Sequence, residues 1–164
     1  MSDPEIKPMA MALAAAEHAA KAGEVPVGAV LVDARGAVLA QTANQVETLG
    51  DPTAHAELLA LREAATQRGR PILDDCDLYV TLEPCAMCAG AIALARIRRL
   101  YFGASDPKGG AVEHGPRFFQ QPTCHHRPEV YGGIDATRAS ELLRRFWGRR
   151  MARRRASAGQ RGPH

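Results

Sequence analysis

The chain has 164 residues, of which 46% are hydrophobic and 24% are charged, and its net charge is +3. This length fits one domain that can build a hydrophobic core of its own. The composition excludes a disordered chain, a collagen and a small disulfide scaffold.

The first predicted element is a helix. Residues 9–22 are good helix formers, and Gly23 ends the run. The apolar stretch 9–16 does not fit a secretory signal, because Asp3 and Glu5 precede it where a basic segment is required. The apolar runs also fall short of the roughly 18 residues of a membrane helix. We therefore expect a cytoplasmic protein with no membrane segment.

Two strands and a second helix are predicted next. Residues 27–33 and 37–43 flank a turn at residues 34–36, and the first run is rich in β-branched residues, a pattern typical of a hairpin. Thr53 is a candidate N-cap for a helix over residues 55–67, whose apolar residues recur along one stripe.

The following elements alternate between strand and helix. Residues 77–82 and 97–103 are predicted strands, and Pro84 is predicted to open a helix that runs to about residue 96. Residues 104–133 are rich in Gly, Pro and His and are predicted to be irregular. Strands that alternate with helices after a hairpin predict a three-layer α/β/α domain with a mixed sheet.

The last predicted helix starts after Asp135. Its apolar residues are expected to form one stripe that packs inward. We expect a single domain over residues 1–156 and a frayed tail over residues 157–164. The stripe consists of Leu142, Leu143, Phe146 and Trp147.

The charge of the chain is divided unevenly. Residues 138–164 contain nine arginines and one acid, Glu141, and so carry +8. Because the total is +3, residues 1–137 carry −5. A basic end on a mildly acidic body favours a polyanionic partner such as RNA, whereas the alternative is a solvated helix end whose cations suit the helix dipole. The predicted contacts to an RNA backbone are Arg144, Arg145, Arg149, Arg150 and Arg153.

Two segments carry the chemistry. His55 and Glu57 form an H-x-E pair, and Cys85 and Cys88 belong to a P-C-x-x-C motif whose first Cys lies 28 residues after Glu57. One His and two Cys suit zinc and leave a fourth coordination position open, as catalytic zinc requires. A C-x-x-C pair alone is also typical of a redox pair or of half a structural zinc site. The two motifs together are the signature of the zinc deaminases.

The spacing predicts how these residues meet. His55 and Glu57 would both lie in the first turn of one helix, and Cys85 and Cys88 in the first turn of another, so the two helix N-termini converge on one metal. The positive dipole ends there favour thiolates. Glu57 is not needed as a ligand and can take a proton from the metal's water, then return it to a ring nitrogen and a leaving amine.

Three longer segments resemble a known family. Residues 24–30, 51–57 and 79–91 are similar to those of the bacterial tRNA-specific adenosine deaminases, in the cytidine-deaminase-like superfamily. The resemblance implies a five-stranded sheet, a homodimer and one zinc ion per subunit. It also implies hydrolysis of the wobble adenosine, position 34 in the tRNA anticodon loop, to inosine, by a zinc-bound hydroxide with Glu57 as proton shuttle.

The resemblance assigns further residues. His55, Cys85 and Cys88 match the zinc ligands, and Asn44 matches a polar contact to the flipped nucleoside, although from the residues alone it reads as a strand-end turn residue. Residues 106–111 resemble the substrate-side loop, in which Asp106 and Lys108 are the predicted substrate contacts.

Other functions stay open at this point. One alternative is a zinc deaminase of a free base or nucleoside of the guanine or cytosine type. Another is a structural-zinc or RNA-binding module without catalysis, which would need a fourth protein ligand on zinc. The run Cys124-His125-His126 is a second metal site, a packed loop, or a loop that faces RNA or the partner of a dimer.

Overall fold

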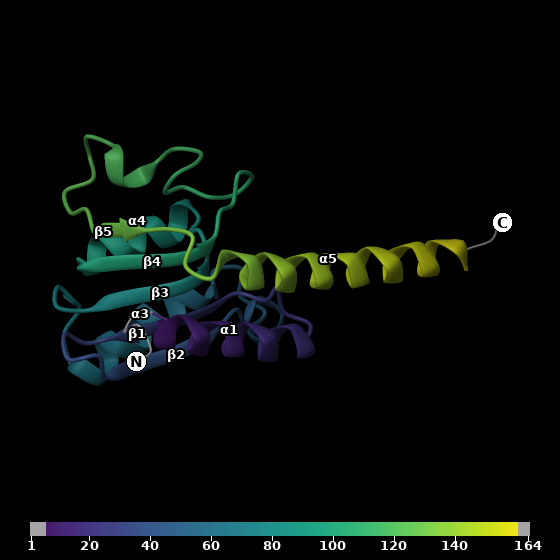
Figure 1. Ribbon diagram of the computed structural model, residues 1–164, viewed down its shortest axis with the longest axis horizontal. Helices are drawn as coiled ribbons and strands as arrows, with labels where there is room; N and C mark the ends of the chain where they lie inside the picture. The colour runs from purple at the N-terminus through teal and green to yellow at the C-terminus, as the bar shows by residue number, and fades with distance from the viewer. Residues whose placement is uncertain (1–5, 161–164) are drawn as a thin grey trace.

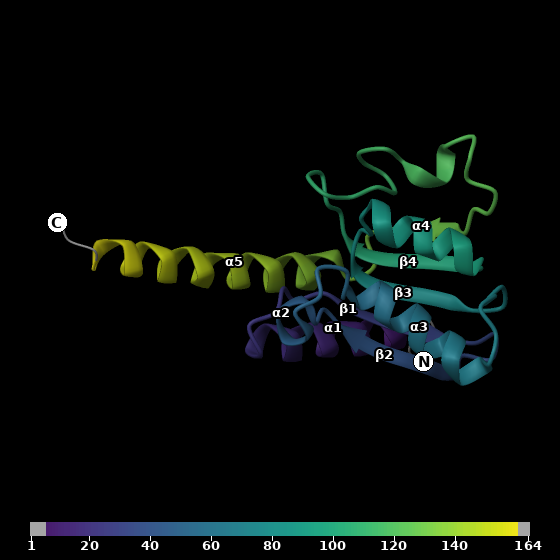
Figure 2. The ribbon, with the colours of Figure 1, turned by 180° about the vertical axis from the view of Figure 1, so that it is seen from behind.

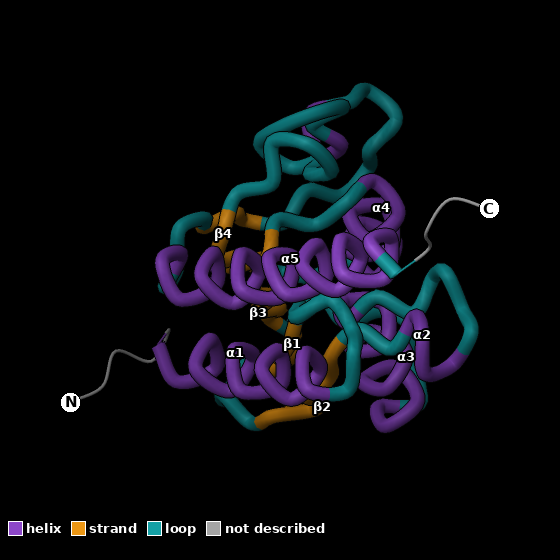
Figure 3. Tube along the Cα trace, turned by 90° about the vertical axis from the view of Figure 1, so that its right-hand side faces the viewer, coloured by secondary structure: helices purple, strands orange, loops and turns teal. Residues whose placement is uncertain are grey.

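The computed structural model describes residues 6–160, in which a five-stranded sheet lies between two layers of helices (Figures 1 and 3). The strand order is β2-β1-β3-β4-β5. The strands are β1 (Gly28–Val32), β2 (Val38–Ala43), β3 (Asp77–Leu82), β4 (Arg99–Ala104) and β5 (Glu129–Tyr131). The helices are α1 (Ile6–Lys21), α2 (Val46–Leu49), α3 (Ala56–Arg68), α4 (Ala86–Ala95) and α5 (Ala136–Gly159), with a short 3₁₀ turn over Phe118–Gln120.

The sheet is mixed, as predicted. β1 pairs with β2 and with β3 in antiparallel fashion, whereas β3, β4 and β5 run parallel. Parallel neighbours bring the carboxyl ends of β3 and β4 to one edge of the sheet, and the segment that leads into α4 leaves β3 at that edge. The α/β/α architecture with five strands is confirmed.

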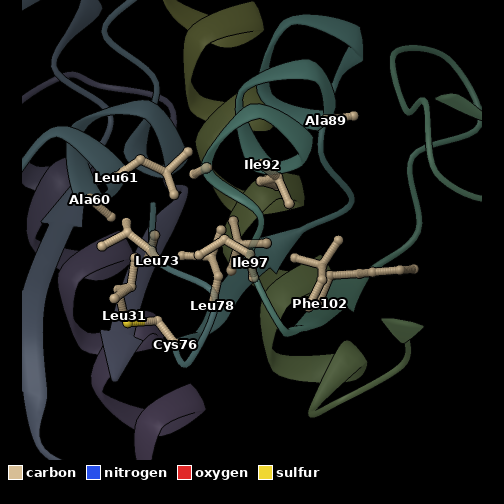
Figure 4. Packing of buried hydrophobic residues seen from close by; sticks show 14 of the residues in the cluster. Leu31, Ala60, Leu61, Leu73, Cys76, Leu78, Ala89, Ile92, Ile97 and Phe102 are labelled. Atoms are coloured by element: carbon tan, nitrogen blue, oxygen red, sulfur yellow. The ribbon is translucent and has the colours of Figure 1, made fainter. Parts of the chain in front are cut away.

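Two hydrophobic clusters hold the layers together. α3 and α4 cover one face of the sheet, where Leu31, Leu78 and Phe102 are fully buried and Ile92 of α4 packs among them (Figure 4). α1 and α5 cover the other face, where Met9 of α1 is buried with residues of β1, β3 and β4. Both helix layers are therefore fixed to the sheet that carries the site.

The predicted irregular stretch 104–133 contains regular structure. β5 lies inside it and pairs with β4 over three residues. A strand this short shows no alternation of its own, and it forms because β4 offers a free edge. α2 was also not predicted, since four residues after β2 give no helical period.

The predicted helix starts need correction. His55, not Thr53, is the N-cap of α3, because the Thr53 amide and hydroxyl both donate to Asp51 Oδ1 at 2.8 Å. Pro84 does not open α4, which begins at Ala86 with Cys85 as its N-cap. As a result, two predicted metal ligands, His55 and Cys85, are the N-cap residues of their helices.

α5 differs from the prediction in two ways. It continues through Gly159, three residues into the segment that was expected to fray, and residues 161–164 lie outside the described part. Trp147 is 46% exposed, so the expected inward stripe is wrong at this position. The reason is visible in Figures 1 and 2: α5 extends past the edge of the sheet, where no layer is left to bury its outer residues.

The Cys124-His125-His126 run forms a packed loop. The Cys124 thiol donates to the carbonyl oxygen of His126 at 3.1 Å, and Nε2 of His126 lies 2.7 Å from the carbonyl oxygen of Ile97. Within residues 6–160 the run contributes no ligand to any metal-binding group of side chains. No helix in the same range is long and apolar enough to cross a membrane.

Candidate active site

The site begins where two helix N-termini meet. His55 and Cys85 are the N-caps of α3 and α4, and Cys88 is the third residue of α4. His55 Nδ1 lies 3.6 Å from the sulfur of Cys85 and 3.5 Å from that of Cys88. The three donor atoms all lie within 4.8 Å of one another, so the predicted convergence is confirmed.

This arrangement fits zinc by size as well as by chemistry. With bonds of about 2.3 Å to sulfur and about 2.0–2.1 Å to nitrogen, tetrahedral ligands lie about 3.6 Å apart. The two nitrogen-to-sulfur distances match that separation. One imidazole and two thiolates would hold the ion, and two of these ligands, His55 and Cys85, line the pocket.

The charges of the three ligands are coupled. Hydrogen bonds from Cys88 and His55 lower the pKa of the Cys85 thiol to about 4, against the effect of its burial. The hydrogen bond to Cys85, burial and the carboxylate of Glu57 raise the pKa of Cys88. The hydrogen bond to Cys85 also raises the pKa of His55. The lowered pKa of Cys85 favours its thiolate at neutral pH, which is the form that binds metal.

Glu57 lies beside this group without belonging to it. Its side chain is only 4% exposed and lines the pocket, and it is not one of the three clustered ligands. Burial raises the pKa of its carboxyl group. A buried carboxyl with a raised pKa can both accept and return a proton near neutral pH.

Asn44 joins the end of β2 to the start of α3. Its Oδ1 accepts a hydrogen bond of 2.8 Å from the backbone N–H of Ala56. Because the oxygen is used in this way, the amide NH₂ is the part of the side chain left to donate. Asn44 lines the pocket together with His55 and Glu57. It is therefore a structural residue at the end of a strand and is also placed to contact a substrate.

The pocket has a volume of about 750 Å³ and collects most of the predicted site. Asp106 and Lys108 line it from the loop after β4, where Asp106 Oδ1 accepts hydrogen bonds from the backbone of Lys108 and Gly109 at 3.2 and 3.0 Å. The predicted substrate, metal and proton-shuttle residues in its wall are Asn44, His55, Glu57, Cys85, Asp106 and Lys108.

The arginines predicted to contact RNA divide by position. Arg150 lines the pocket, with its guanidinium 5.5 Å from the centre of the Trp147 ring. Arg145, Arg149 and Arg153 lie along a groove next to the pocket. Arg144 is exposed on another face of α5 and lines neither cavity.

Glu83 is a residue of the site that the sequence analysis missed. Its side chain is fully buried and accepts hydrogen bonds of 3.1–3.2 Å from the backbone N–H groups of Asp106, Val112, Glu113 and His114. His114 Nδ1 adds a contact of 2.7 Å. Burial alone would raise the pKa of Glu83, but these hydrogen bonds lower it. One carboxylate thus fixes the loop that carries the predicted substrate contacts.

Glu24 holds another segment of the pocket wall in the same way. Its buried carboxylate accepts hydrogen bonds from the backbone of Glu47 at 2.9 Å and of Thr48 at 2.8 Å, and from the Thr48 hydroxyl at 2.7 Å. It thereby holds α2 beside the pocket, which Glu24 and Glu47 both line. The sequence offered one indication of this role, which is that Glu24 is a charged residue shortly before the first predicted strand.

Comparison with known proteins agrees with this geometry. Residues 3–104 match the family model described as the cytidine and deoxycytidylate deaminase zinc-binding region. The chain is 55% identical over 139 residues to the tRNA-specific adenosine deaminase of Agrobacterium fabrum, covering 85% of this chain and 91% of that protein.

Two solved structures are similar to the chain. One comes from a study of A-to-I editing by tRNA:A34 deaminases at the wobble position; it has 55% identity and a TM-score of 0.82, and the match covers 84% of this chain and 99% of that one. The other is a guanine deaminase from Bacillus subtilis with 36% identity and a TM-score of 0.60, over 76% and 82% of the two chains. The chain therefore belongs to the zinc-binding cytidine and deoxycytidylate deaminase family, in the branch of the tRNA-specific adenosine deaminases.

Proposed function

We propose that the protein hydrolyses adenosine at position 34 of tRNA to inosine and ammonia. The observation that carries this proposal is the placement of Glu57, a buried carboxyl that lines the pocket beside the three clustered metal ligands. That arrangement supports hydrolysis rather than structural metal binding, because within residues 6–160 the group has three ligands and no fourth.

The metal and Glu57 would have separate roles in the reaction. His55, Cys85 and Cys88 would hold a zinc ion, which would supply Lewis-acid activation of the attacking water. Glu57 takes the proton from the attacking water and delivers it to N1 of adenine. The second proton of the water, from the hydroxyl now on C6, passes through the same carboxyl to the 6-amino group. The C6–N bond breaks, ammonia leaves, and Glu57 ends the cycle in its starting state.

The pocket walls would orient the nucleoside. The amide NH₂ of Asn44 is free to donate to the substrate because its oxygen is held by Ala56. Asp106 and Lys108 approach from the loop that Glu83 anchors. Trp147 stands half exposed at the rim and offers a flat face to a base next to the reacting one.

The partner would be the anticodon loop of a tRNA, with phosphates on the arginines of α5. A tRNA substrate also supports the proposal of a cytoplasmic location. We further propose a homodimer, because Met87 and Leu94, seven residues apart on α4, are 37% and 81% exposed and form an apolar face that a second copy can cover.

The experiment is to incubate total tRNA from a strain lacking this enzyme with the purified zinc-loaded protein and to sequence the product. Inosine is read as guanosine, so the proposal predicts a new A-to-G change at position 34. Ammonia release from free adenosine, guanine and cytosine is measured beside it. Faster turnover of a free base than of tRNA would assign the protein to the small-molecule deaminases instead.

A further inference from the structure

A basic groove runs between the end of α1 and the middle of α5, from Leu142 to Arg153. The two helices lie side by side over the same face of the sheet (Figure 3), and the groove between them has a volume of about 480 Å³. Five cations and one acid line it: Lys21, Arg145, Arg149, Arg150 and Arg153, with Glu17. The groove is therefore positive and shaped to accept an extended anion.

The groove continues from the catalytic pocket. Gly23 and Arg150 line both cavities, so the pocket and the groove adjoin at these two residues. The Arg150 guanidinium lies 5.8 Å from the centre of the Phe146 ring and 5.5 Å from that of Trp147, which fixes it at the junction. A chain that leaves the pocket past Trp147 enters the groove directly.

The cations are arranged as a ladder. Arg145, Arg149 and Arg153 follow one another every four residues, so their Cα atoms lie about 6 Å apart along the helix axis. Within the described residues, Arg145 is the one of these three arginines that forms an ion pair. Its partner is Glu141, at 4.0 Å, and both side chains are exposed. A row of cations with so little internal neutralisation suits a polymer with a repeating negative charge.

We infer that this groove holds the phosphates that flank the reacting nucleotide, an inference that rests on the proposed function. The RNA strand leaves the pocket over Trp147, passes Arg150 and runs between Lys21 and the arginine ladder. The other arginines of α5 are not equivalent to the ladder. Arg154 and Arg155 lie on the same helix but line neither the pocket nor the groove, and they supply a matched comparison.

The experiment compares two double variants with the same loss of charge. Arg145→Gln/Arg149→Gln removes two groove cations, and Arg154→Gln/Arg155→Gln removes two from the same helix outside it. Binding of a fluorescein-labelled anticodon stem-loop is followed by anisotropy over a series of NaCl concentrations. For each lost phosphate contact on a single strand, the slope of log K against log salt falls by about 0.7. The groove variant should lower the slope by about 1.4 and weaken binding about tenfold at low salt.

The comparison variant should change the slope by less than half as much. Equal changes in both variants, or no change in the groove variant, would overturn the inference. Inosine formation by the unaltered enzyme is measured on the same stem-loop, which keeps the two proposals apart. Inosine formed without a groove effect contradicts this inference alone, whereas no inosine at all contradicts the proposed function. At saturating RNA the groove variant should keep its kcat within about twofold while KM rises, because the cations bind substrate and do not touch the reacting base.

Discussion

The side-chain oxygen of Asn44 accepts a hydrogen bond from the backbone N–H of Ala56 at 2.8 Å, one residue after the N-cap His55. The same residue therefore caps the metal-bearing end of α3 and presents an amide NH₂ to the pocket. These two functions can be separated by substitution, because Asp keeps the acceptor oxygen and loses the donor.

Asn44→Asp should leave the fold and the zinc content unchanged and lower kcat/KM for the anticodon stem-loop by about 10- to 100-fold, the value of one hydrogen bond to the substrate. Asn44→Ala should lower activity to a similar degree and also reduce the free energy of unfolding by about 1 kcal/mol, since the Ala56 amide loses its partner. Full activity of Asn44→Asp would show that the NH₂ makes no contact with substrate. Steady-state kinetics and thermal unfolding provide the two readouts.

Gly110→Ala tests the anchored loop. A Cβ at this position would clash with Glu83 Oε2 and would lie 2.5 Å from the carbonyl oxygen of Asp106, so the loop has to move. We expect a rise in KM and a loss of about 1–3 kcal/mol of stability. Gly148→Ala is the control, because its Cβ meets nothing within 4 Å and an alanine in a helix adds stability. If Gly110→Ala behaved like this control, the loop would not be held by Glu83 as described.

Glu24→Gln should make stability less sensitive to acid. Burial raises the pKa of Glu24, but hydrogen bonds from Glu47 and Thr48 lower it overall, below its ordinary value of 4.5. A carboxyl with a lowered pKa in the folded state stabilises the protein fully above pH 4.5, and this contribution is lost as the pH falls through the lower folded value. The difference in free energy of unfolding between wild type and Glu24→Gln should be about 1–3 kcal/mol at neutral pH and shrink in acid.

Chemical denaturation at a series of pH values measures this difference. Zinc release in acid affects both proteins alike and cancels in the comparison. Glu47→Gln removes an exposed carboxyl from α2, the helix that Glu24 holds, and should show a difference close to zero at neutral pH. A Glu24 difference that stays constant from neutral pH down to about 3 would refute the proposed role of the carboxylate.

Cys88→Ala should abolish zinc binding. Its thiolate is one of three ligands, and two remaining donors hold zinc far more weakly. Cys76→Ala removes another buried thiol that lies outside the metal group, so it should keep one zinc per chain. Atomic absorption after gel filtration gives the stoichiometry. Stoichiometric zinc in Cys88→Ala would mean that another residue completes the site.

The metal group could be predicted from the sequence because its geometry is local. His55 and Glu57 stand at the start of α3, and Cys85 and Cys88 at the start of α4, so placing both helix N-termini at one sheet edge brings the ligands together. The hairpin and the alternation of strands with helices could be predicted equally well, since each depends on residues that are close together in the sequence. The predicted starts of α3 and α4 were wrong because Thr53 and Pro84, on which they relied, are also favoured in turns.

The residues that support the site could not be predicted. Glu83 and Glu24 bind backbone N–H groups 23–31 and 23–24 residues away, and a backbone donor leaves no mark in the sequence. Trp147 reads as a core residue because its exposure depends on where α5 leaves the sheet, which is a property of the tertiary structure. The same holds for β5, whose pairing with β4 spans 30 residues.

The most direct test of the account is inosine formation at tRNA position 34 by the wild type and by Glu57→Gln, both loaded with one zinc ion. The amide has the size of the carboxyl but cannot carry the proton, so single-turnover rates should fall by about 10²- to 10⁴-fold at unchanged zinc content. Wild-type enzyme should convert position 34 completely under the same conditions. A Glu57→Gln protein that forms inosine at the wild-type rate would contradict the central claim that Glu57 carries the proton.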